Sequence, residues 1–235
     1  MDTQTRHALK GDKFAQATVS GFSWLSGHRS GLLVWAVSAA VVVLVLGGGL
    51  TFWNQRTTAA DVALGSAMDI YTAQLALPGA PPETGVYATA NERSKASYEK
   101  FAAAAREYGW LPEGTQAHYF AGVTAAELGQ SGTAETELKA AAGSWDRNLA
   151  NLAKLALAGL YHGTARDQQA IDVYNGLIAK PSETVPATVA QLDLADLYAL
   201  QGKQDQARTL WAKVKDADKD GAAGSIASQK LGAKQ

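Results

Sequence analysis

Cysteine is absent from the 235 residues of this chain. Its absence excludes disulfide bridges, thiolate metal sites, a cysteine nucleophile and a lipid anchor on cysteine. It does not fix the compartment, because a helical domain of this size buries enough apolar surface to fold without covalent links.

The sequence also lacks a strong excess of charge of either sign, with 21 basic and 22 acidic residues. Residues 1–53 hold four basic and two acidic residues, so the remainder holds 17 basic and 20 acidic residues, a net charge of −3. A weakly acidic domain repels phosphate, so we expect no nucleic-acid partner.

Charge is missing altogether from residues 31–53, a run of 23 mostly apolar residues. At 1.5 Å per residue a helix of this length crosses the roughly 30 Å hydrocarbon core of a bilayer. Trp35 and Trp53 lie near its two ends, where aromatic rings prefer the interface. A cleavable signal peptide or a buried core helix are the alternatives. The run is longer than a signal h-region of about 7–15 residues, which favours a single transmembrane helix.

The flanking charges predict the orientation of this helix. Four Lys or Arg residues precede it, whereas Arg56 is the only one in the 35 residues that follow. The positive-inside rule therefore places residues 1–30 in the cytoplasm and residues 54–235 outside it. In a bacterium this is an inner-membrane protein with a periplasmic domain. Residues 12–28 fit either a short interfacial helix or a flexible tail.

An alternating strand pattern is absent after residue 54, and the prolines fall between the expected helices. We therefore expect an all-α domain. Its first helix pair is predicted at residues 58–77 and 87–108, with the first helix following almost directly on the membrane helix. The Pro/Gly-rich stretch 78–86 joins the pair.

Small residues then recur in a fixed frame: a small residue, an aromatic residue three later, Ala twelve later and an aromatic residue sixteen later. The first copy is weaker, because Ala125 and Leu138 stand where the aromatic residues are expected. This frame is typical of the tetratricopeptide repeat, in which two antiparallel helices approach closely. The first residues of three copies are 36 and 37 positions apart, near the usual period of about 34. We therefore predict a tetratricopeptide-like helical-hairpin solenoid over residues 54–216, followed by a tail or cap at 217–235. The copies are Gly122, Ala125, Ala134 and Leu138; Ala158, Tyr161, Ala170 and Tyr174; and Ala195, Tyr198, Ala207 and Trp211.

Enzyme signatures such as a P-loop, G-x-S-x-G and H-E-x-x-H are absent, so we expect no catalytic, cofactor or metal residues. Residues 216–221 (DADKDG) match the first half of a calcium loop. The twelfth position, which should carry a bidentate Glu, is Ala227. A solvated acidic turn explains this segment.

The first helix of each repeat lines the concave groove of such a solenoid, and the residues assigned to it here are mostly apolar. A groove of this kind suits an extended or helical peptide. Two alternatives stay open: the C-terminal residues fold back into the groove, or Leu152 and Leu155 simply complete the core. The predicted groove residues are Gln116, Tyr119, Val123, Leu152, Leu155, His162, Val189, Leu192 and Asp196.

The whole layout resembles the YfgM-like family of ancillary subunits of the Sec translocon. The resemblance rests on the segment KGDKF before the helix, the helix end TFWNQR, and an A-x-x-x-Y pattern from Ala67 to Tyr71. It implies association with the SecYEG channel, a membrane-anchored periplasmic chaperone as neighbour, and chaperone-like contact with secreted client chains. The loop at 78–86 departs from the compact repeat. The alternative is an assembly or coordination factor for another envelope complex, such as the division or respiratory machinery.

Overall fold

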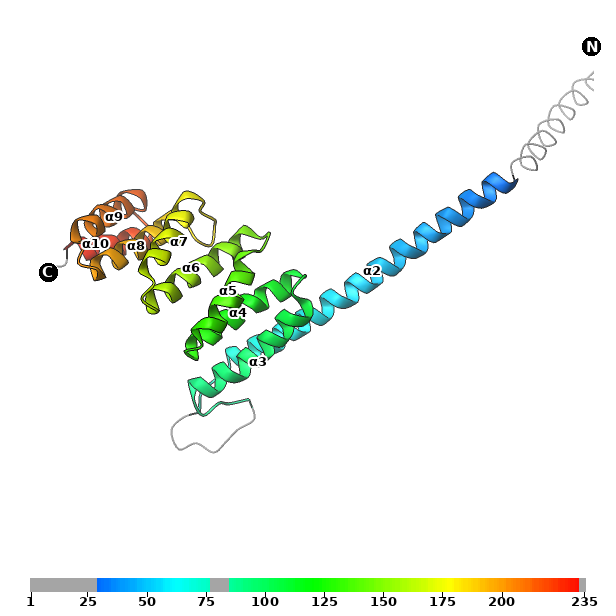
Figure 1. Ribbon diagram of the computed structural model, residues 1–235, viewed down its shortest axis with the longest axis horizontal. Coiled ribbons are helices and arrows are strands. Elements are labelled where there is room, and N and C mark those ends of the chain that lie inside the picture. The colour runs from blue at the N-terminus through cyan, green and yellow to red at the C-terminus, as the bar shows by residue number, and fades with distance from the viewer. Residues whose placement is uncertain (1–28, 77–84, 233–235) are drawn as a thin grey trace, which may run out of the picture. The chain divides into compact units, whose positions relative to one another are not determined.

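The computed structural model describes residues 29–76 and 85–232 (Figure 1). The chain divides into two units, Met1–Gln55 and Arg56–Gln235. Within the described residues all regular structure is helical, apart from an isolated bridge between Leu75 and Tyr87. The choice between interfacial helix and tail for residues 12–28 lies outside the described part of the chain.

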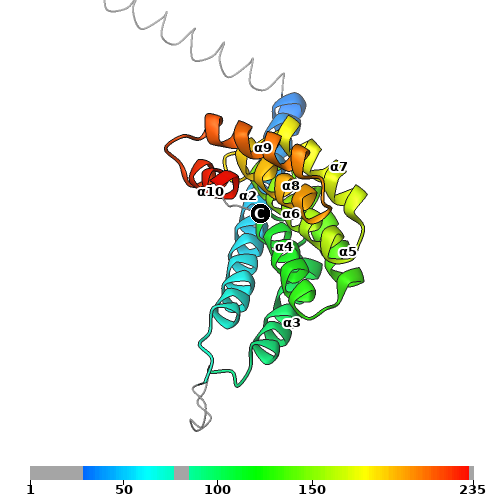
Figure 2. The same cartoon turned by 90° about the vertical axis from the view of Figure 1, so that its left-hand side faces the viewer.

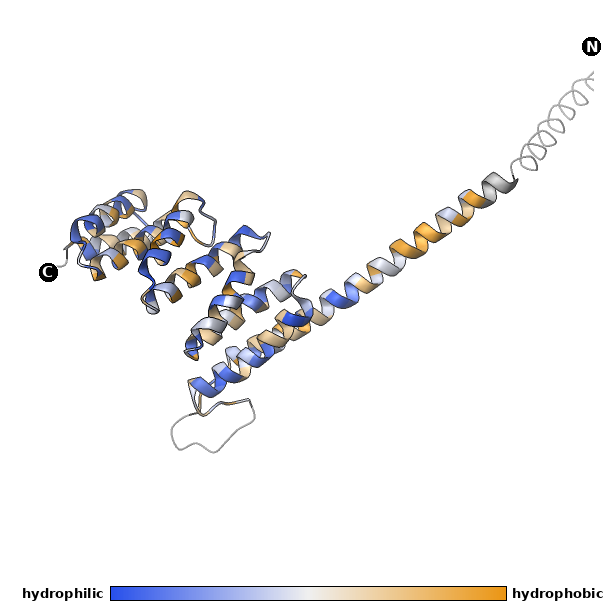
Figure 3. Cartoon of the chain, in the orientation of Figure 1, coloured by the Kyte–Doolittle hydropathy of each residue, from blue (hydrophilic) through white to orange (hydrophobic). Residues whose placement is uncertain are grey.

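The first unit contributes the apolar part of helix α2 (Arg29–Tyr71). Side chains from Val34 to Trp53 are exposed and almost uniformly apolar, as the orange band in Figure 3 shows. Twenty helical residues rise about 30 Å, the thickness of a hydrocarbon core. Among the described residues this is one helix long and apolar enough to cross a membrane, judged by length and composition.

Three consecutive glycines in this helix do not interrupt it. The hydroxyl of Thr51 donates to the carbonyl oxygens of Gly47 and Gly48, at 3.1 and 2.9 Å. A polar side chain that bonds the preceding helical turn is compatible with an apolar environment, because no donor is left without a partner.

Helix α2 continues past the apolar run and ends at Tyr71 instead of the predicted residue 77. The chain then turns to extended backbone, in which the amide of Ala76 donates to Tyr87 at 2.9 Å and the amide of Tyr87 donates to Gln74 at 3.2 Å. These two bonds close the Pro/Gly-rich loop at its base. The second helix accordingly begins at Ala90 and not at residue 87.

The second unit continues with short helices that are joined by tight turns (Figures 1 and 2). From α3 on, each helix packs against the next one in the chain. They are α3 (Ala90–Tyr108), α4 (Pro112–Glu127), α5 (Ser131–Ala142), α6 (Arg147–Gly163), α7 (Asp167–Ala179), α8 (Ala187–Leu200), α9 (Gln204–Ala217) and α10 (Ala222–Gly232).

The residues of the repeated frame form the contacts between paired helices. Eleven of the twelve are buried, and the twelfth, Tyr198, is half-buried against the core. The closest approach is at Gly122 on α4, where a Cβ atom would lie 2.5 Å from Cγ of Leu138 and 3.0 Å from its backbone nitrogen. Only a residue without a side chain fits this position of α4 against α5.

The turn inside each of these helix pairs has the same geometry. Gly129, Ala165 and Gly202 have φ of +73°, +57° and +74°, and each follows a helix end. In all three turns the amide of the following residue donates a hydrogen bond to the carbonyl oxygen five residues earlier, for example from Arg166 to Tyr161 at 2.8 Å. This is the hydrogen-bond pattern of a Schellman C-cap, which favours glycine. The middle turn uses alanine instead.

The C-terminal segment, expected as a tail or cap, forms helix α10 and packs against α9 and α8. Gly224 and Ala227 are buried, and Ala227 joins a cluster with Trp211 and Val214 of α9. An extra helix of this kind covers the apolar end of the last pair.

The Gly122 contact predicts opposite effects of two Gly→Ala changes. Gly122→Ala should lower the free energy of unfolding by about 1–2 kcal/mol, because overpacking outweighs the gain in helix propensity. Gly176→Ala in α7, where a Cβ meets nothing within 4 Å, should raise it by about 0.5–1 kcal/mol. Denaturant titrations of the full chain in detergent micelles measure both. A Gly122→Ala protein as stable as wild type would refute the close approach.

The repeated turn predicts a second pair of changes. Ala165→Gly should stabilise the protein by about 1 kcal/mol, because it removes the cost of holding a Cβ-bearing residue at positive φ. Gly129→Ala should cost a similar amount for the same reason. If both substitutions changed the free energy of unfolding in the same direction, the shared turn geometry would be contradicted.

Candidate functional site

The predicted groove residues lie on α4, α6 and α8. Gln116 is exposed and the other eight side chains are half-buried. Tyr119, Val123, Leu152 and Leu155 pack against one core cluster that includes Leu138 and Leu157. The four are therefore partly buried apolar side chains at the edge of this core, two on α4 and two on α6, and these two helices are in contact.

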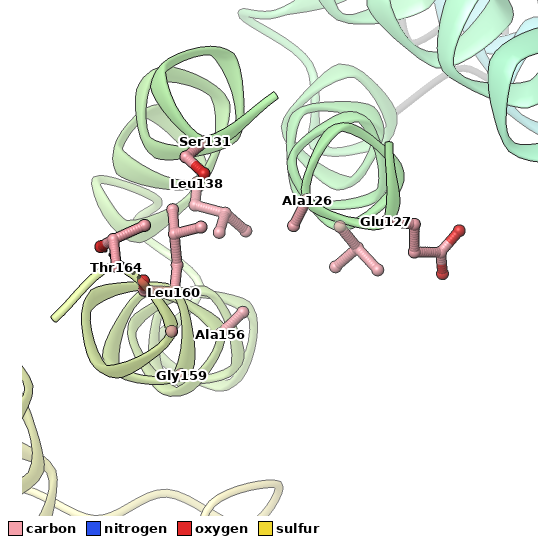
Figure 4. A pocket seen from close by; sticks show the side chains of 10 residues that line it. Ala126, Glu127, Ser131, Leu138, Ala156, Gly159, Leu160 and Thr164 are labelled. Carbon is pink, nitrogen blue, oxygen red and sulfur yellow. Dashed lines mark hydrogen bonds between the residues drawn. The ribbon is translucent and has the colours of Figure 1, made fainter. Parts of the chain in front are cut away.

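A pocket of about 430 Å³ opens between α4, α5 and α6 (Figure 4). Leu138 of α5 and Leu160 of α6 point into it, with Ala126 of α4 opposite. Its volume lies in the lower part of the range of about 300–1,000 Å³ that is usual for ligand pockets. The lining is Val123, Ala126, Glu127, Ser131, Leu138, Ala156, Gly159, Leu160, Gly163 and Thr164.

Two polar side chains at the rim of this pocket, Glu127 and Thr164, have partners within the domain. The Glu127 carboxylate points away from Leu138 and Leu160 in Figure 4 and accepts from the hydroxyls of Ser94 at 2.6 Å and Tyr71 at 3.3 Å. The Thr164 hydroxyl donates to the carbonyl of Leu160 at 2.8 Å. Apart from these two groups and the hydroxyl of Ser131, the side chains that line the pocket are apolar.

Of the nine predicted residues only Val123 lines this pocket. The prediction missed Ala156, Gly159, Leu160 and Gly163, all on α6. For Ala156, Gly159 and Gly163 the signal in the sequence is a second stripe of small residues at helical spacing, which the repeat frame does not require. Small side chains there leave the space open instead of filling it.

His162 and Asp196, two ionisable members of the predicted set, form hydrogen bonds within the domain. Nδ1 of His162 lies 2.8 Å from Oδ1 of Asp167. Asp196 accepts from Nε1 of Trp211 at 3.1 Å and from Lys230 at 2.8 Å. Since Lys230 belongs to α10, the C-terminal helix reaches the predicted groove position on α8. A partner would have to displace these bonds to reach either side chain.

Burial raises the pKa of the Tyr119 phenol. This half-buried tyrosine on α4 therefore stays protonated across the physiological range. It presents to a partner an apolar ring and a hydroxyl that can donate a hydrogen bond.

Polar bonds recur between consecutive helix pairs, each joining residues 31–34 positions apart. Glu135 is the centre of the densest group, with Arg166 at 2.6 Å, Lys139 at 2.7 Å and the Tyr161 hydroxyl at 3.2 Å. Hydrogen bonds from Lys139 and then Arg166 lower the pKa of Glu135 to about 2. The four recurring bonds are Ser94–Glu127, Glu135–Arg166, Asp167–Gln201 and Asp196–Lys230.

The acidic stretch at residues 216–221 covers the last two residues of α9 and the turn that leads into α10. Oδ2 of Asp218 accepts from the amide of Gly224 at 3.1 Å, while Asp216 and Asp220 are exposed. In the described part of the chain, no three His, Cys, Asp or Glu side chains come close enough to hold a metal ion. Asp218 thus caps the N-terminus of α10 by accepting a hydrogen bond from an amide of its first turn.

Comparisons of this chain with protein-family models, curated proteins and solved structures found no match.

The Glu135 group predicts a pH-dependent stability. Its folded pKa lies below the unfolded value near 4.5, so its contribution is present above about pH 4.5 and is lost as the pH falls toward 2. Glu135→Gln should therefore cost about 1–2 kcal/mol at pH 7, because a fifth of the side chain is exposed and water screens the charges.

The difference between Glu135→Gln and wild type should shrink between pH 4.5 and pH 2 in urea titrations of the full chain. Glu183→Gln, at an exposed position between α7 and α8, serves as the matched control and should stay near wild type throughout. A loss at Glu135 that is independent of pH would mean that the pairing with Lys139 and Arg166 contributes nothing.

Proposed function

We propose that this protein is a membrane-anchored scaffold that binds other proteins through a tetratricopeptide-like helical solenoid. The observation that carries the proposal is a set of partly buried apolar side chains on α4 and α6, beside a mostly apolar pocket whose Glu127 and Thr164 side chains are bonded within the domain. Such a surface gains free energy from apolar side chains of a partner, at roughly 25 cal/mol per Å² buried.

Three periodic features support the solenoid. The small residues of the frame are buried. The turns at Gly129, Ala165 and Gly202 are 36 and 37 residues apart. The polar bonds Glu135–Arg166 and Asp167–Gln201 join residues that are 31 and 34 positions apart. A repeat of one helix pair explains all three, because each pair covers the apolar face of the one before it.

The occupant that this surface fits best is an extended or helical peptide segment. Tyr119, Val123, Leu152 and Leu155 offer a half-buried apolar strip, and the adjoining pocket takes a projecting side chain. Nothing in this arrangement demands one particular sequence, which suits a protein that contacts many clients.

The membrane helix supplies the second part of the proposal. The positive-inside rule puts residues 1–30 in the cytoplasm and the helical domain in the periplasm of a bacterium. Anchoring beside a secretion channel gives an effective concentration on the order of 1 mM, so weak affinity is sufficient for repeated contact with emerging chains. Together with the resemblance described above, this favours an ancillary subunit of the Sec translocon with a chaperone-like role.

A photo-crosslinking amino acid placed at Tyr119 or Leu155 of the full chain in native membranes tests the proposal. Both positions should capture SecYEG subunits or nascent secreted chains. The same group at Asp172, on the exposed surface of α7, is the control and should capture neither.

Gly159→Leu places a large side chain in the pocket without a clash, because a Cβ at residue 159 has no other atom within 4 Å. This change should reduce the yield of crosslinks from Leu155 several-fold. Gly176→Leu, an equally open glycine on α7, should leave them unchanged. Crosslinks only to division or respiratory proteins would instead favour an assembly factor for those complexes. Yields at Tyr119 and Leu155 no higher than at Asp172 would reject the binding surface.

A further inference from the structure

Two tryptophans in turns of the second unit lie at its surface. Trp110 is 56% exposed between α3 and α4, and Trp145 is 85% exposed between α5 and α6. Both line one hollow of about 260 Å³, together with His118 and Ser144. The fold thus brings together two large aromatic side chains that are 35 residues apart in sequence, and neither belongs to a core cluster.

The turn that carries Trp110 is held against the first residues of the second unit. Tyr108 and Leu111 on either side of it pack with Ala60 of α2. The Glu107 carboxylate lies 3.5 Å from the Arg56 guanidinium. These contacts fix the tryptophan turn to the stretch of α2 that directly follows the apolar run.

The chain length between this contact and the apolar run is short. Ala60 is seven residues beyond Trp53, the last residue of that run. Seven residues span about 10 Å as a helix and at most about 25 Å when fully extended. Whatever the orientation of the domain, its Trp110 turn therefore stays within reach of the membrane surface.

The chemistry of this patch matches the headgroup layer of a bilayer. The indole ring combines a large apolar surface with one N–H donor, and tryptophan is enriched at membrane interfaces for this reason. The exposed charges beside the two rings balance, with Arg106 and Glu107 in one turn and Asp146 and Arg147 in the other. Attraction to the interface therefore comes from the rings and needs no anionic lipid.

We propose that Trp110 and Trp145 insert into the headgroup layer of the membrane that holds helix α2, and so fix the orientation of the helical domain. This inference rests on the membrane anchoring in the proposed function. It adds a second point of attachment, one that leaves the α4–α6 surface facing a defined direction for its clients.

The absence of native cysteine allows single reporters in the full chain, reconstituted into lipid nanodiscs without other proteins. A fluorophore on Ser144→Cys, beside Trp145, should be quenched by nitroxides at headgroup depth. A fluorophore on Thr209→Cys, on the exposed surface of α9, should not be quenched. Quenching at Ser144→Cys should be equal in zwitterionic and mixed anionic bilayers.

Adding Trp145→Ser to the Ser144→Cys protein should remove about half or more of the quenching, and adding Trp110→Ser as well should abolish it. Because Trp145 is largely exposed, circular dichroism should be unchanged. Quenching that survives both changes, or that requires anionic lipid, would overturn the inference.

A reporter on Val45→Cys, inside the apolar run, separates the two proposals. Quenching there by acyl-chain nitroxides with none at Ser144→Cys means that the anchor holds and the tryptophan docking fails, which would point to a protein partner for the patch. No quenching at Val45→Cys would refute the anchor itself, and with it the proposed function.

Discussion

The close approach of neighbouring helices through residues with little or no side chain is the constraint on which the rest of the domain depends. At Gly122 the backbone of α4 leaves no room for a Cβ beside Leu138, and the buried alanines of the frame repeat this contact in the following pairs. Dispersion contacts fall off steeply with distance, so the pairs are stable only at this spacing. This distance between neighbouring helices also determines where the connecting turns and the polar bonds between pairs can form.

The polar bonds take the place of apolar packing at the edges of the helix pairs. Glu135 with Arg166 and Asp167 with Gln201 join one pair to the next, and Lys230 extends the series to the final helix through Asp196. Bonds to charged groups are directional, so they fix the relative rotation of pairs that alanine contacts alone leave loosely defined.

The function proposed above depends on proximity. In it, the half-buried apolar side chains on α4 and α6 bind clients without strong selectivity, and the membrane helix supplies the local concentration that such binding needs. The proposed insertion of Trp110 and Trp145 would add orientation, because a domain held at one flexible point would present its surface in every direction.

The sequence by itself determined the features that depend on local periodicity: the uncharged run at 31–53, the all-helical character of the described domain, and the frame residues that are buried. Each of these follows from spacing along a single helix or between two helices joined by a short turn. Other features depend on which side chains and helices meet, and only the tertiary structure decided them. Helix α2 ends at Tyr71, the turn at Ala165 has positive φ without a glycine, α10 packs on α9, and Gly159 borders a pocket in place of a core contact. A stripe of small residues has the same sequence pattern whether a neighbouring helix packs against it or a pocket remains beside it. The sequence does not distinguish the two cases, because the outcome depends on which helix packs there in the folded chain.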